Sequence, residues 1–582
     1  MRTRLLSTLW LMTLTMVTAC TPTTDPDADT AKPNVILFLV DDMGWSDLGV
    51  YGSEFYDTPN IDALASGGVR FTSAYAAGHV CSPTRASLMT GKYPARLQLT
   101  DWLPGRAAHD HEAVVAAPRA KGLALDETTI AEVFREHGYR TGIFGKWHLG
   151  GDDYGPTLQG FDIQVPQWNG CCPMGGYHPP YVMEGLAIPG REAEYVTDRL
   201  TELAVDFIGE ASDQPYFLYM SHFSVHDPIQ GRADLVDKYR EKLAAQPERS
   251  GSPFILEANP DEPEPLSREE LDALIDTPAY SGHYGLSNRA VKIKQHQDNI
   301  EFAAMVESID ESIGRILAAL EANGDTKNTI IVFYSDNGGM SAANAGYGSP
   351  TTMDVEALVA GAQQMANKRA ASAGKTAGKT GGKTGGNTGG KTGKIGLKGG
   401  QLDNLDLAYA TSNLPLRGAK GWLYEGGIRV PLIVHWPVKG AQGLVSDVPV
   451  TSADFYPTLL EMAGLPLQPA QHVDGVSFAP VVEGSVTGEQ DADLAMRPIF
   501  WHFPHYSNHG GQSPGGAVRS GPYKLLEYYE NGSTQLFNLD EDIGEQVNLV
   551  ASEPEIAASL LAELHAWRER VDATMPGRRD QQ

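Results

Sequence analysis

The sequence predicts an α/β fold in which helices cover both faces of a mostly parallel β-sheet. Short runs of branched and apolar residues, such as 35–40 and 330–334, have the composition of strands that are buried on both faces. The segments between such runs carry apolar residues at every third or fourth position, as amphipathic helices do. Alternation of the two patterns is typical of a parallel sheet with helices on both sides.

The individual elements follow from these patterns. Strands are predicted at residues 35–40, 141–144, 216–220, 330–334 and 430–434. Helices are predicted at residues 129–137 and 300–320, each followed by a glycine as a stop signal. Near the C-terminus, strands are predicted at residues 517–529 and 535–539, and a closing helix at 556–571. We therefore expect one large domain over residues 33–495 and a smaller C-terminal α+β domain over residues 496–575.

The N-terminus has the pattern of a secretion signal. Arg2 and Arg4 precede an apolar run, residues 5–17, that is too short to cross a bilayer comfortably. The following letters VTAC are similar to a bacterial lipobox, so residues 1–20 are predicted to be a lipoprotein-type signal peptide with Cys20 as the lipidated residue. An ordinary signal peptide cut nearby is the alternative. We expect an exported protein, in the periplasm or at the cell surface, anchored to a bacterial membrane by lipid.

The charge of the chain limits its partners. The 582 residues carry a formal net charge of −28, which argues against nucleic acid because phosphate binding requires a basic surface. An anionic substrate would have to be captured by a local group of lysine, arginine, histidine and metal.

A glycine, lysine and threonine tract at residues 374–394 interrupts the large domain. Its low complexity predicts a flexible, cationic insertion, residues 371–400. Residues 385–392 match the phosphate-loop pattern G-x4-G-K-T, but no apolar strand precedes the tract, so we reject a nucleotide site.

The chain has four cysteines, and their number indicates that at least one has a special role. If Cys20 carries lipid, the remaining set in an oxidising compartment is odd: Cys81, Cys171 and Cys172. The adjacent pair, Cys171 and Cys172, could form a disulfide or remain two free thiols.

Ionisable side chains follow several of the predicted strands. Ligands of open α/β sheets bind beyond the carboxyl ends of the strands, so these side chains are expected to share one site. They are Asp41, Asp42, Lys146, His148, His222, His226, Asp336 and Asn337, with Lys420 in the loop before residues 430–434.

Four of these residues offer only oxygen ligands. Asp41, Asp42, Asp336 and Asn337 are the set expected for Ca²⁺ or Mg²⁺ rather than zinc, and we favour calcium. Neighbouring side chains of a strand point to opposite faces, so joint ligation by Asp41 and Asp42 requires a turn, which Gly44 makes plausible.

The stretch CSPTRASLMTG, residues 81–91, places a cysteine at the start of a predicted helix. Pro83 suits the first turn of a helix, so Cys81 lies at the amino end, where an anion is favoured, with Arg85 about one turn further along. The pattern C-x-P-x-R-x4-T-G resembles the activation signature of the type I sulfatases. The segments VDDMG, GKWHLG, HDP, SDNGG and LRGAKGWLYEGG are similar to other blocks of that family, in the same order.

The resemblance implies an alkaline-phosphatase-like fold and a modified nucleophile. A maturation enzyme would oxidise Cys81 to Cα-formylglycine (3-oxoalanine). Its hydrated aldehyde would attack sulfur with one hydroxyl, and the second hydroxyl would then help to expel sulfate. Calcium would be bound by residue 81 together with Asp41, Asp42, Asp336 and Asn337.

The resemblance also implies roles for the cationic residues. Arg85 and His148 would support the diol, and Lys146 and Lys420 would hold sulfate oxygens. His226 would protonate the leaving oxygen, which is worth roughly 10² to 10⁴ in rate for a poor leaving group such as a sugar alkoxide. His222 is the alternative acid, although a packed histidine at a strand end is favoured for it.

We expect a sulfated poly- or oligosaccharide as the substrate, from the similarity to exported bacterial members of the family. Candidate substrate contacts are Trp168, Tyr177, His178, His502 and His505. Two alternatives remain open: a phosphonate or phosphodiester hydrolase of the same superfamily, and a non-catalytic glycan-binding lipoprotein.

Overall fold

The computed structural model describes residues 32–108, 112–186, 194–247, 252–258, 266–275, 290–342, 409–485, 489–507 and 512–579. The predicted signal peptide with Cys20 and the predicted insertion at 371–400 lie outside these residues. The two predicted domains fall within one compact unit, Pro33–Gln582. Within the described part of the chain, no helix is both long enough and apolar enough to cross a bilayer.

The core of the protein is a nine-stranded, mostly parallel sheet, as the sequence predicted. Its central strand β1 (Asn34–Val40) runs parallel to β9 (Thr329–Ser335) on one side and to β6 (Tyr216–Ser221) on the other. Parallel pairing continues to β4 (Arg140–Gly145) and β5 (Ile163–Val165).

The other half of the sheet contains an antiparallel strand. The strand β10 (Arg429–His435) is antiparallel both to β9 and to β2 (Val69–Tyr75). The short strands β11 (Leu444–Ser446) and β12 (Val450–Thr451) pair with β2. Because β10 runs against its neighbours, the loop before it reaches the edge of the sheet where the parallel strands end.

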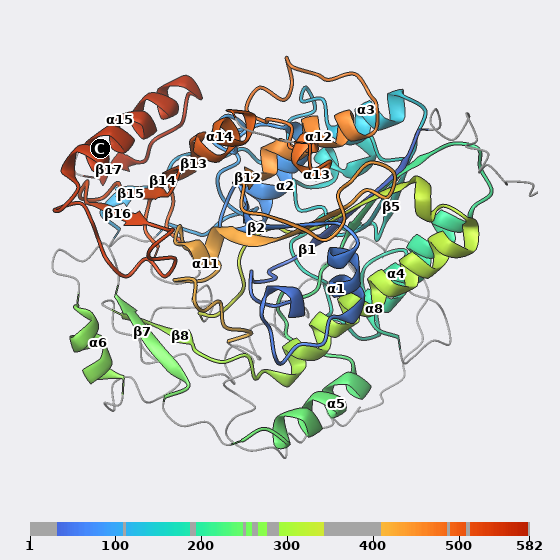
Figure 1. Ribbon diagram of the computed structural model, residues 1–582, viewed down its shortest axis with the longest axis horizontal. Helices are drawn as coiled ribbons and strands as arrows, with labels where there is room; N and C mark the ends of the chain where they lie inside the picture. Colours follow the sequence, from blue (N-terminus) through green and yellow to red (C-terminus); the bar gives the residue numbers. More distant parts are fainter. Residues whose placement is uncertain are drawn as a thin grey trace, which may run out of the picture. The chain divides into compact units, whose positions relative to one another are not determined.

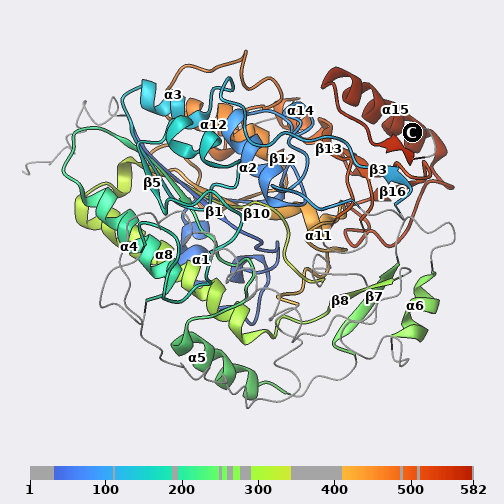
Figure 2. The ribbon, with the colours of Figure 1, turned by 180° about the vertical axis from the view of Figure 1, so that it is seen from behind.

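Helices cover both faces of the sheet (Figures 1 and 2). One face carries α1 (Pro59–Ser66), α4 (Val196–Gly209) and α8 (Ile300–Asn323), and the other carries α2 (Cys81–Thr90), α3 (Ile130–Glu136) and α12 (Phe455–Met462). Alternate residues of β1 point to opposite faces of the sheet. Ile36 and Phe38 pack on the face that carries α1, α4 and α8, and Leu37 and Leu39 pack on the face that carries α2, α3 and α12. A strand buried on both faces must be apolar throughout, which explains the unbroken apolar run.

The ends of the predicted helices are set by local capping. Thr129 and Glu132 form a capping box at the start of α3. Asn299 caps α8, which ends at Gly324 in the left-handed conformation. Both helices match the sequence prediction.

Smaller elements surround the sheet. They are the helices α5 (Ala233–Ala244), α6 (Arg268–Leu274), α11 (Glu425–Ile428), α13 (Ala479–Val482) and α14 (Glu489–Met496), the pair β7 (Phe254–Ala258) and β8 (Ala290–Lys294), and the pair β3 (Val114–Val115) and β17 (Gly577–Arg578).

The C-terminal segment forms a separate four-stranded antiparallel sheet. Its strands are β13 (Ile499–Phe503), β14 (Gly515–Ser520), β15 (Tyr523–Tyr528) and β16 (Thr534–Asn538), and the helix α15 (Pro554–Arg570) follows. The single strand predicted at 517–529 was wrong. Gly521, with a φ of 54°, and the proline after it turn the chain, so the segment forms a hairpin of β14 and β15.

Candidate active site

The first two carboxylates lie at the end of β1. The backbone N–H of Asp41 donates to the carbonyl of Ser224 at 3.0 Å, and the Asp41 carbonyl accepts from Val225 at 2.7 Å, which fixes the chain as it leaves the strand. Asp42 has a φ of 66°, a left-handed conformation that is uncommon for a residue other than glycine. The turn required for joint ligation is therefore at Asp42 itself. Ligand atoms of Asp41, Asp42, Cys81 and His226 all lie within 4.8 Å of one another.

The end of β9 supplies the other two oxygen ligands. Asp336 Oδ1 accepts the backbone N–H of Asp42 at 3.2 Å. Asn337 Nδ2 donates to Asp42 Oδ1 at 2.8 Å, whereas Asn337 Oδ1 is buried without any hydrogen-bond partner. A buried amide oxygen beside carboxylates costs free energy unless something binds it, so this donor set fits a hard divalent cation.

Cys81 is the first residue of α2, as predicted. Its Sγ lies 3.4 Å from Asp41 Oδ1, and its side chain is 2 % exposed. Val80, before it, is extended, so the thiol lies at the amino end of α2. Cys81 is free of any disulfide and lies beside the carboxylates.

Arg85, in the next turn of α2, forms hydrogen bonds to three other segments of the site. Its Nε donates to Asp336 Oδ2 at 2.9 Å, and its Nη1 donates to Ser221 Oγ at 2.7 Å and to the carbonyl of Lys146 at 3.0 Å. The guanidinium thus joins the ends of β9, β6 and β4. Ser221 was not among the predicted site residues, although it directly precedes His222 at the end of β6.

Two buried lysines complement the carboxylates. Lys146 Nζ lies 2.6 Å from Asp41 Oδ2, and Lys420 Nζ lies 2.7 Å from Asp42 Oδ2. Burial lowers the pKa of Lys420, but Asp42 outweighs it and raises the pKa above the usual value. Burial and Asp336 raise the pKa of Asp41 to about 6. Charges of both signs are therefore concentrated in one small volume.

His148 is neutral in this environment. Burial and the neighbouring Lys146 lower the pKa of His148 well below its usual value. Its Nε2 lies 2.6 Å from the carbonyl of Leu103, and its Nδ1 is buried without a partner. A neutral ring that donates from Nε2 keeps Nδ1 as an acceptor.

His226 has the opposite protonation state. Its Nδ1 donates to the carbonyl oxygen of Asp227 at 2.8 Å and lies 2.6 Å from Asp227 Oδ1, and its Nε2 lies 3.6 Å from Asp42 Oδ2. Burial lowers the pKa of His226, but the carboxylates of Asp42 and Asp227 outweigh it and raise the pKa well above the usual value. The ring is therefore an imidazolium beside the carboxylate of Asp42. Asp227, which orients the ring, was quoted in the HDP turn but not predicted as a site residue.

The second histidine of this region is placed elsewhere. His222 Nε2 lies 3.2 Å from Ser312 Oγ on α8, and burial lowers the pKa of His222 to about 3. It is a packed, neutral histidine.

The predicted carboxylates, Cys81, the two lysines, Arg85 and His226 thus lie in one cluster. Comparison with known proteins identifies the family. A family model described as "Sulfatase" matches residues 33–465. The chain belongs to the sulfatase family. A second model, described as "N-sulphoglucosamine sulphohydrolase, C-terminal", matches residues 419–570 of this sulfatase.

Individual relatives cover nearly all of the sulfatase. A protein of Formosa agariphila named "Sulfatase" is 27% identical over 92% of this chain and 88% of its own length, and arylsulfatase A of Bos taurus is 27% identical over 97% and 92%. The crystal structure of Ps i-CgsB in complex with k-i-k-neocarrahexaose has a TM-score of 0.60 and 25% sequence identity, with 92% of each chain covered. The alkaline-phosphatase-like α/β fold and sulfuric ester hydrolase activity are thereby confirmed.

Two of the candidate substrate contacts, His502 and His505, bond to other side chains of the protein. His502 Nδ1 lies 2.8 Å from the hydroxyl of Tyr529, and His505 Nε2 lies 2.8 Å from Thr100 Oγ1. Burial lowers the pKa of His502 to about 4 and that of His505 to about 3. Both histidines are buried, and their contact with substrate stays a prediction.

The loop before α4 carries the other candidate contacts. Trp168 Nε1 donates to the carbonyl of Cys172 at 2.8 Å, and Cys172 forms a disulfide with Cys171. Tyr177 is fully buried, whereas His178 is exposed. Direct substrate contact by Trp168 and His178 stays a prediction, and Tyr177 offers no exposed surface for stacking on a sugar.

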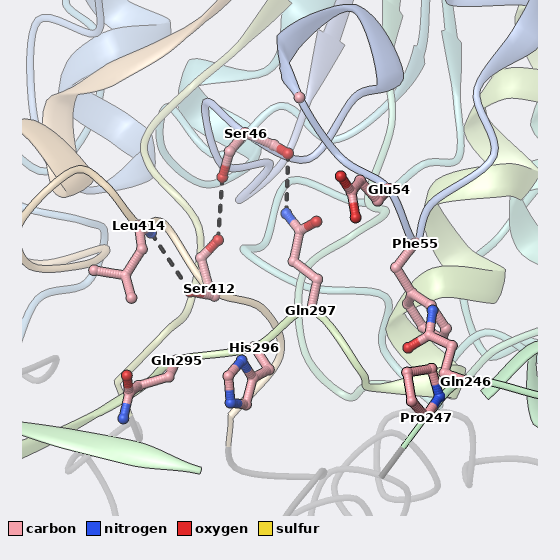
Figure 3. A pocket seen from close by; sticks show the side chains of 11 residues that line it. Ser46, Glu54, Phe55, Gln246, Pro247, Gln295, His296, Gln297, Ser412 and Leu414 are labelled. Carbon is pink, nitrogen blue, oxygen red and sulfur yellow. Dashed lines mark hydrogen bonds between the residues drawn. The ribbon is translucent and has the colours of Figure 1, made fainter. Parts of the chain in front are cut away.

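A large cavity lies beside the loop after β1 (Figure 3). It has a volume of about 800 Å³, and its walls include Glu54, Gln297 and Ser412. Gln297 donates to the carbonyl of Ser46, which also lines the cavity. Its described lining includes Glu54 and His296 but no lysine or arginine. The cluster around Cys81, in contrast, holds the buried cations Arg85, Lys146 and Lys420.

Proposed function

We propose that this sulfatase hydrolyses sulfate monoesters of a carbohydrate with calcium and with a Cα-formylglycine that is made from Cys81. One observation carries the proposal: the thiol of Cys81 lies 3.4 Å from Asp41, among hard oxygen ligands and buried cations. A glycan-binding protein without activity would need neither an oxidisable residue nor this concentration of charge.

The calcium ion would be held by residue 81 with Asp41, Asp42, Asp336 and Asn337. Magnesium would suit the same oxygens, but calcium accepts a less regular set of ligands and is plentiful outside cells. When bound, the cation would offset the repulsion between an anionic ester and an anionic nucleophile. The unpartnered oxygen of Asn337 supports this assignment.

The oxidised residue 81, made by a maturation enzyme, would supply as a hydrated aldehyde the oxygen that attacks sulfur. The surrounding side chains hold charge and protons in place. Arg85 fixes Asp336, and the free Nδ1 of the neutral His148 can accept a proton from a neighbouring hydroxyl. Lys146 and Lys420 place positive charge where sulfate oxygens become more negative.

His226 protonates the leaving oxygen. Its ring is positively charged, and Asp227 holds Nδ1, so Nε2 carries a proton beside the site. A sugar alkoxide leaves poorly without a proton, and a positioned acid contributes about 10² to 10⁴ in rate.

A carbohydrate substrate is supported by the comparisons. The structure of Ps i-CgsB, which is 25% identical, is a complex with k-i-k-neocarrahexaose. The C-terminal match is to a family described by a sulphohydrolase of N-sulphoglucosamine. We also place the enzyme outside the cytoplasm, anchored through Cys20, on the strength of the apolar run at residues 5–17.

The test compares matched esters. The enzyme is produced with a formylglycine-generating enzyme and assayed with 4-nitrophenyl sulfate and 4-nitrophenyl phosphate. We expect the larger kcat/KM for the sulfate, and Cys81→Ala to lower it by more than about 10³-fold. A preference for the phosphate would favour the phosphonate or phosphodiester hydrolase instead, and full activity of Cys81→Ala would rule out the proposed nucleophile.

A further inference from the structure

The hydroxyl of Tyr177 is bonded to the turn that carries His226. It donates to the carbonyl of Phe223 at 2.7 Å and to the carbonyl of His226 itself at 2.9 Å. The ring of Tyr177 is fully buried. We propose that Tyr177 is a positioning residue for the general acid His226, an inference that rests on the proposed function.

The bond is part of a wider attachment between two loops. The backbone N–H of Tyr177 donates to Gln230 Oε1 at 3.0 Å, and its carbonyl accepts the N–H of Val196, the first residue of α4, at 2.9 Å. His178 Nε2 lies 3.1 Å from the carbonyl of Gly231. Tyr177 is therefore held both by α4 and by the segment after β6, which gives its hydroxyl a fixed position.

The position of the His226 backbone decides where its acidic proton lies. Asp227 fixes Nδ1 of the ring, and Nε2 faces Asp42 at 3.6 Å. The orientation of the ring is thus set by its neighbour, but its location is set by the backbone to which Tyr177 donates. A general acid must lie within about 2.6 to 3.2 Å of the oxygen that it protonates, so a small shift of this turn weakens proton transfer.

Removal of the hydroxyl alone separates this role from packing. Tyr177→Phe keeps the buried ring but removes the donor to the carbonyl of His226. The carbonyl of Phe223 loses one of its two donors and keeps the N–H of His226. The matched control is Tyr195→Phe. Tyr195 is 1% exposed, stacks on Tyr177 with ring centroids 5.6 Å apart, and donates to the carbonyl of Gln230 at 2.8 Å rather than to His226. Each variant loses one buried hydroxyl, but only Tyr177→Phe loses a donor to the carbonyl of His226.

The experiment measures how rate depends on the leaving group. The holoenzyme, Tyr177→Phe, Tyr195→Phe and His226→Ala are assayed with 4-nitrophenyl, phenyl and 4-methoxyphenyl sulfate, and log kcat/KM is plotted against the pKa of the leaving phenol. The slope does not depend on the fraction of enzyme that carries formylglycine. An effective acid makes the slope shallow, and its loss makes the slope steeper. Thermal unfolding of each variant is measured in parallel.

We expect His226→Ala to give the steepest slope, Tyr177→Phe an intermediate one, and Tyr195→Phe the slope of the unmodified enzyme. For 4-methoxyphenyl sulfate, Tyr177→Phe should lose about tenfold in kcat/KM. A steep slope for His226→Ala with an unchanged slope for Tyr177→Phe would overturn this inference and leave the proposed function intact. An unchanged slope for His226→Ala would remove the proposed acid, and the inference with it. Equal steepening in the two tyrosine variants would show general loosening and would also overturn the inference.

Discussion

At the residue scale, the unpartnered oxygen of Asn337 is the most direct sign of a cation. Asn337→Ala removes that oxygen and keeps the carboxylates of Asp41, Asp42 and Asp336. Because a ligand that binds only the folded state raises its stability, calcium should raise the melting temperature of the unmodified protein. The variant should need at least about tenfold more calcium for the same rise, the equivalent of about 1.4 kcal/mol.

The control for this titration is Asn323→Ala at the exposed end of α8, where the side chain donates to the carbonyl of Ile208. It should respond to calcium like the unmodified protein. Identical calcium titrations for Asn337→Ala and the unmodified protein would exclude Asn337 as a ligand.

His222 gives a prediction for the pH dependence of stability. Burial lowers its pKa from 6.5 to about 3, so the unfolded chain binds a proton between these values that the folded protein does not. His222 therefore does not lower the free energy of unfolding above pH 6.5. Below pH 6.5 it lowers that free energy by about 1.4 kcal/mol for each pH unit, until about pH 3.

His222→Gln removes this titration and keeps a side chain that can bond to Ser312. Between pH 6.5 and pH 4.5, the free energy of unfolding should fall less steeply in the variant, as measured by urea denaturation. The variant should keep the leaving-group slope of the unmodified enzyme, because the proposed mechanism assigns the acid to His226. Parallel pH curves for the two proteins would show that His222 is protonated in the folded state.

At the element scale, the end of β4 depends on a glycine. Gly145 has a φ of 120°, and a Cβ at this position would lie 1.7 Å from the carbonyl oxygen of Ser221. The N–H of Lys146 donates to that same oxygen at 2.7 Å. Close approach of β4 and β6 at this point is what directs Lys146 toward Asp41.

Gly145→Ala should therefore lower the free energy of unfolding by more than about 3 kcal/mol and reduce sulfatase activity. Gly324→Ala is the matched control. Gly324 also has a positive φ, 78°, but a Cβ there would have nothing within 4 Å, so only the backbone cost of about 1 kcal/mol is expected. Equal losses in urea denaturation would show that backbone conformation, rather than the clash, decides the effect.

Strands and helices could be predicted because burial dictates their patterns. The strand at 35–40 is apolar on both faces, and α8 repeats its apolar positions regularly over many turns. Three features had no such signal. The antiparallel direction of β10 depends on the strands that pair with it. The left-handed turn at Asp42 occurs without a glycine. The hairpin within 517–529 has the sequence pattern of a single strand.

At the scale of the whole molecule, a buried ionic cluster joins the two sheets. Lys524 on β15 lies 2.9 Å from Glu425 Oε1 and 2.9 Å from Glu545 Oε1, and its side chain is fully buried. Glu425 opens α11 and follows the loop of Lys420. The C-terminal sheet thus supports the segment that brings Lys420 to the active site.

Lys524→Met should lower the free energy of unfolding by about 3 to 5 kcal/mol, because it leaves the buried Glu545 without its cation and leaves Glu425 with its ion pair to Arg429. Arg240→Ala removes an exposed ion pair with Asp237 and should cost less than about 1 kcal/mol. Chemical denaturation followed by tryptophan fluorescence measures both. A change below 1 kcal/mol for Lys524→Met would show that the cluster does not hold the sheets together.

The composition of the active site could be predicted from the sequence, but its supports could not. The proposed metal ligands and Cys81 belong to short motifs at the ends of strands or at the start of a helix. Ser221 and Asp227 stand next to predicted residues, but nothing in their own positions distinguishes them. Tyr177 was predicted as a substrate contact, and only the structure reveals that its hydroxyl is bonded to the turn of His226.

The central claim is that Cys81 acts as formylglycine, and the mass of one peptide tests it most directly. Trypsin releases residues 71–85 from enzyme made with the maturation enzyme. We expect this peptide to be about 18 Da lighter than its cysteine form, and the modified fraction to rise and fall with the rate of sulfate ester hydrolysis. An enzyme that hydrolyses sulfate esters at full rate with Cys81 unmodified would contradict the account.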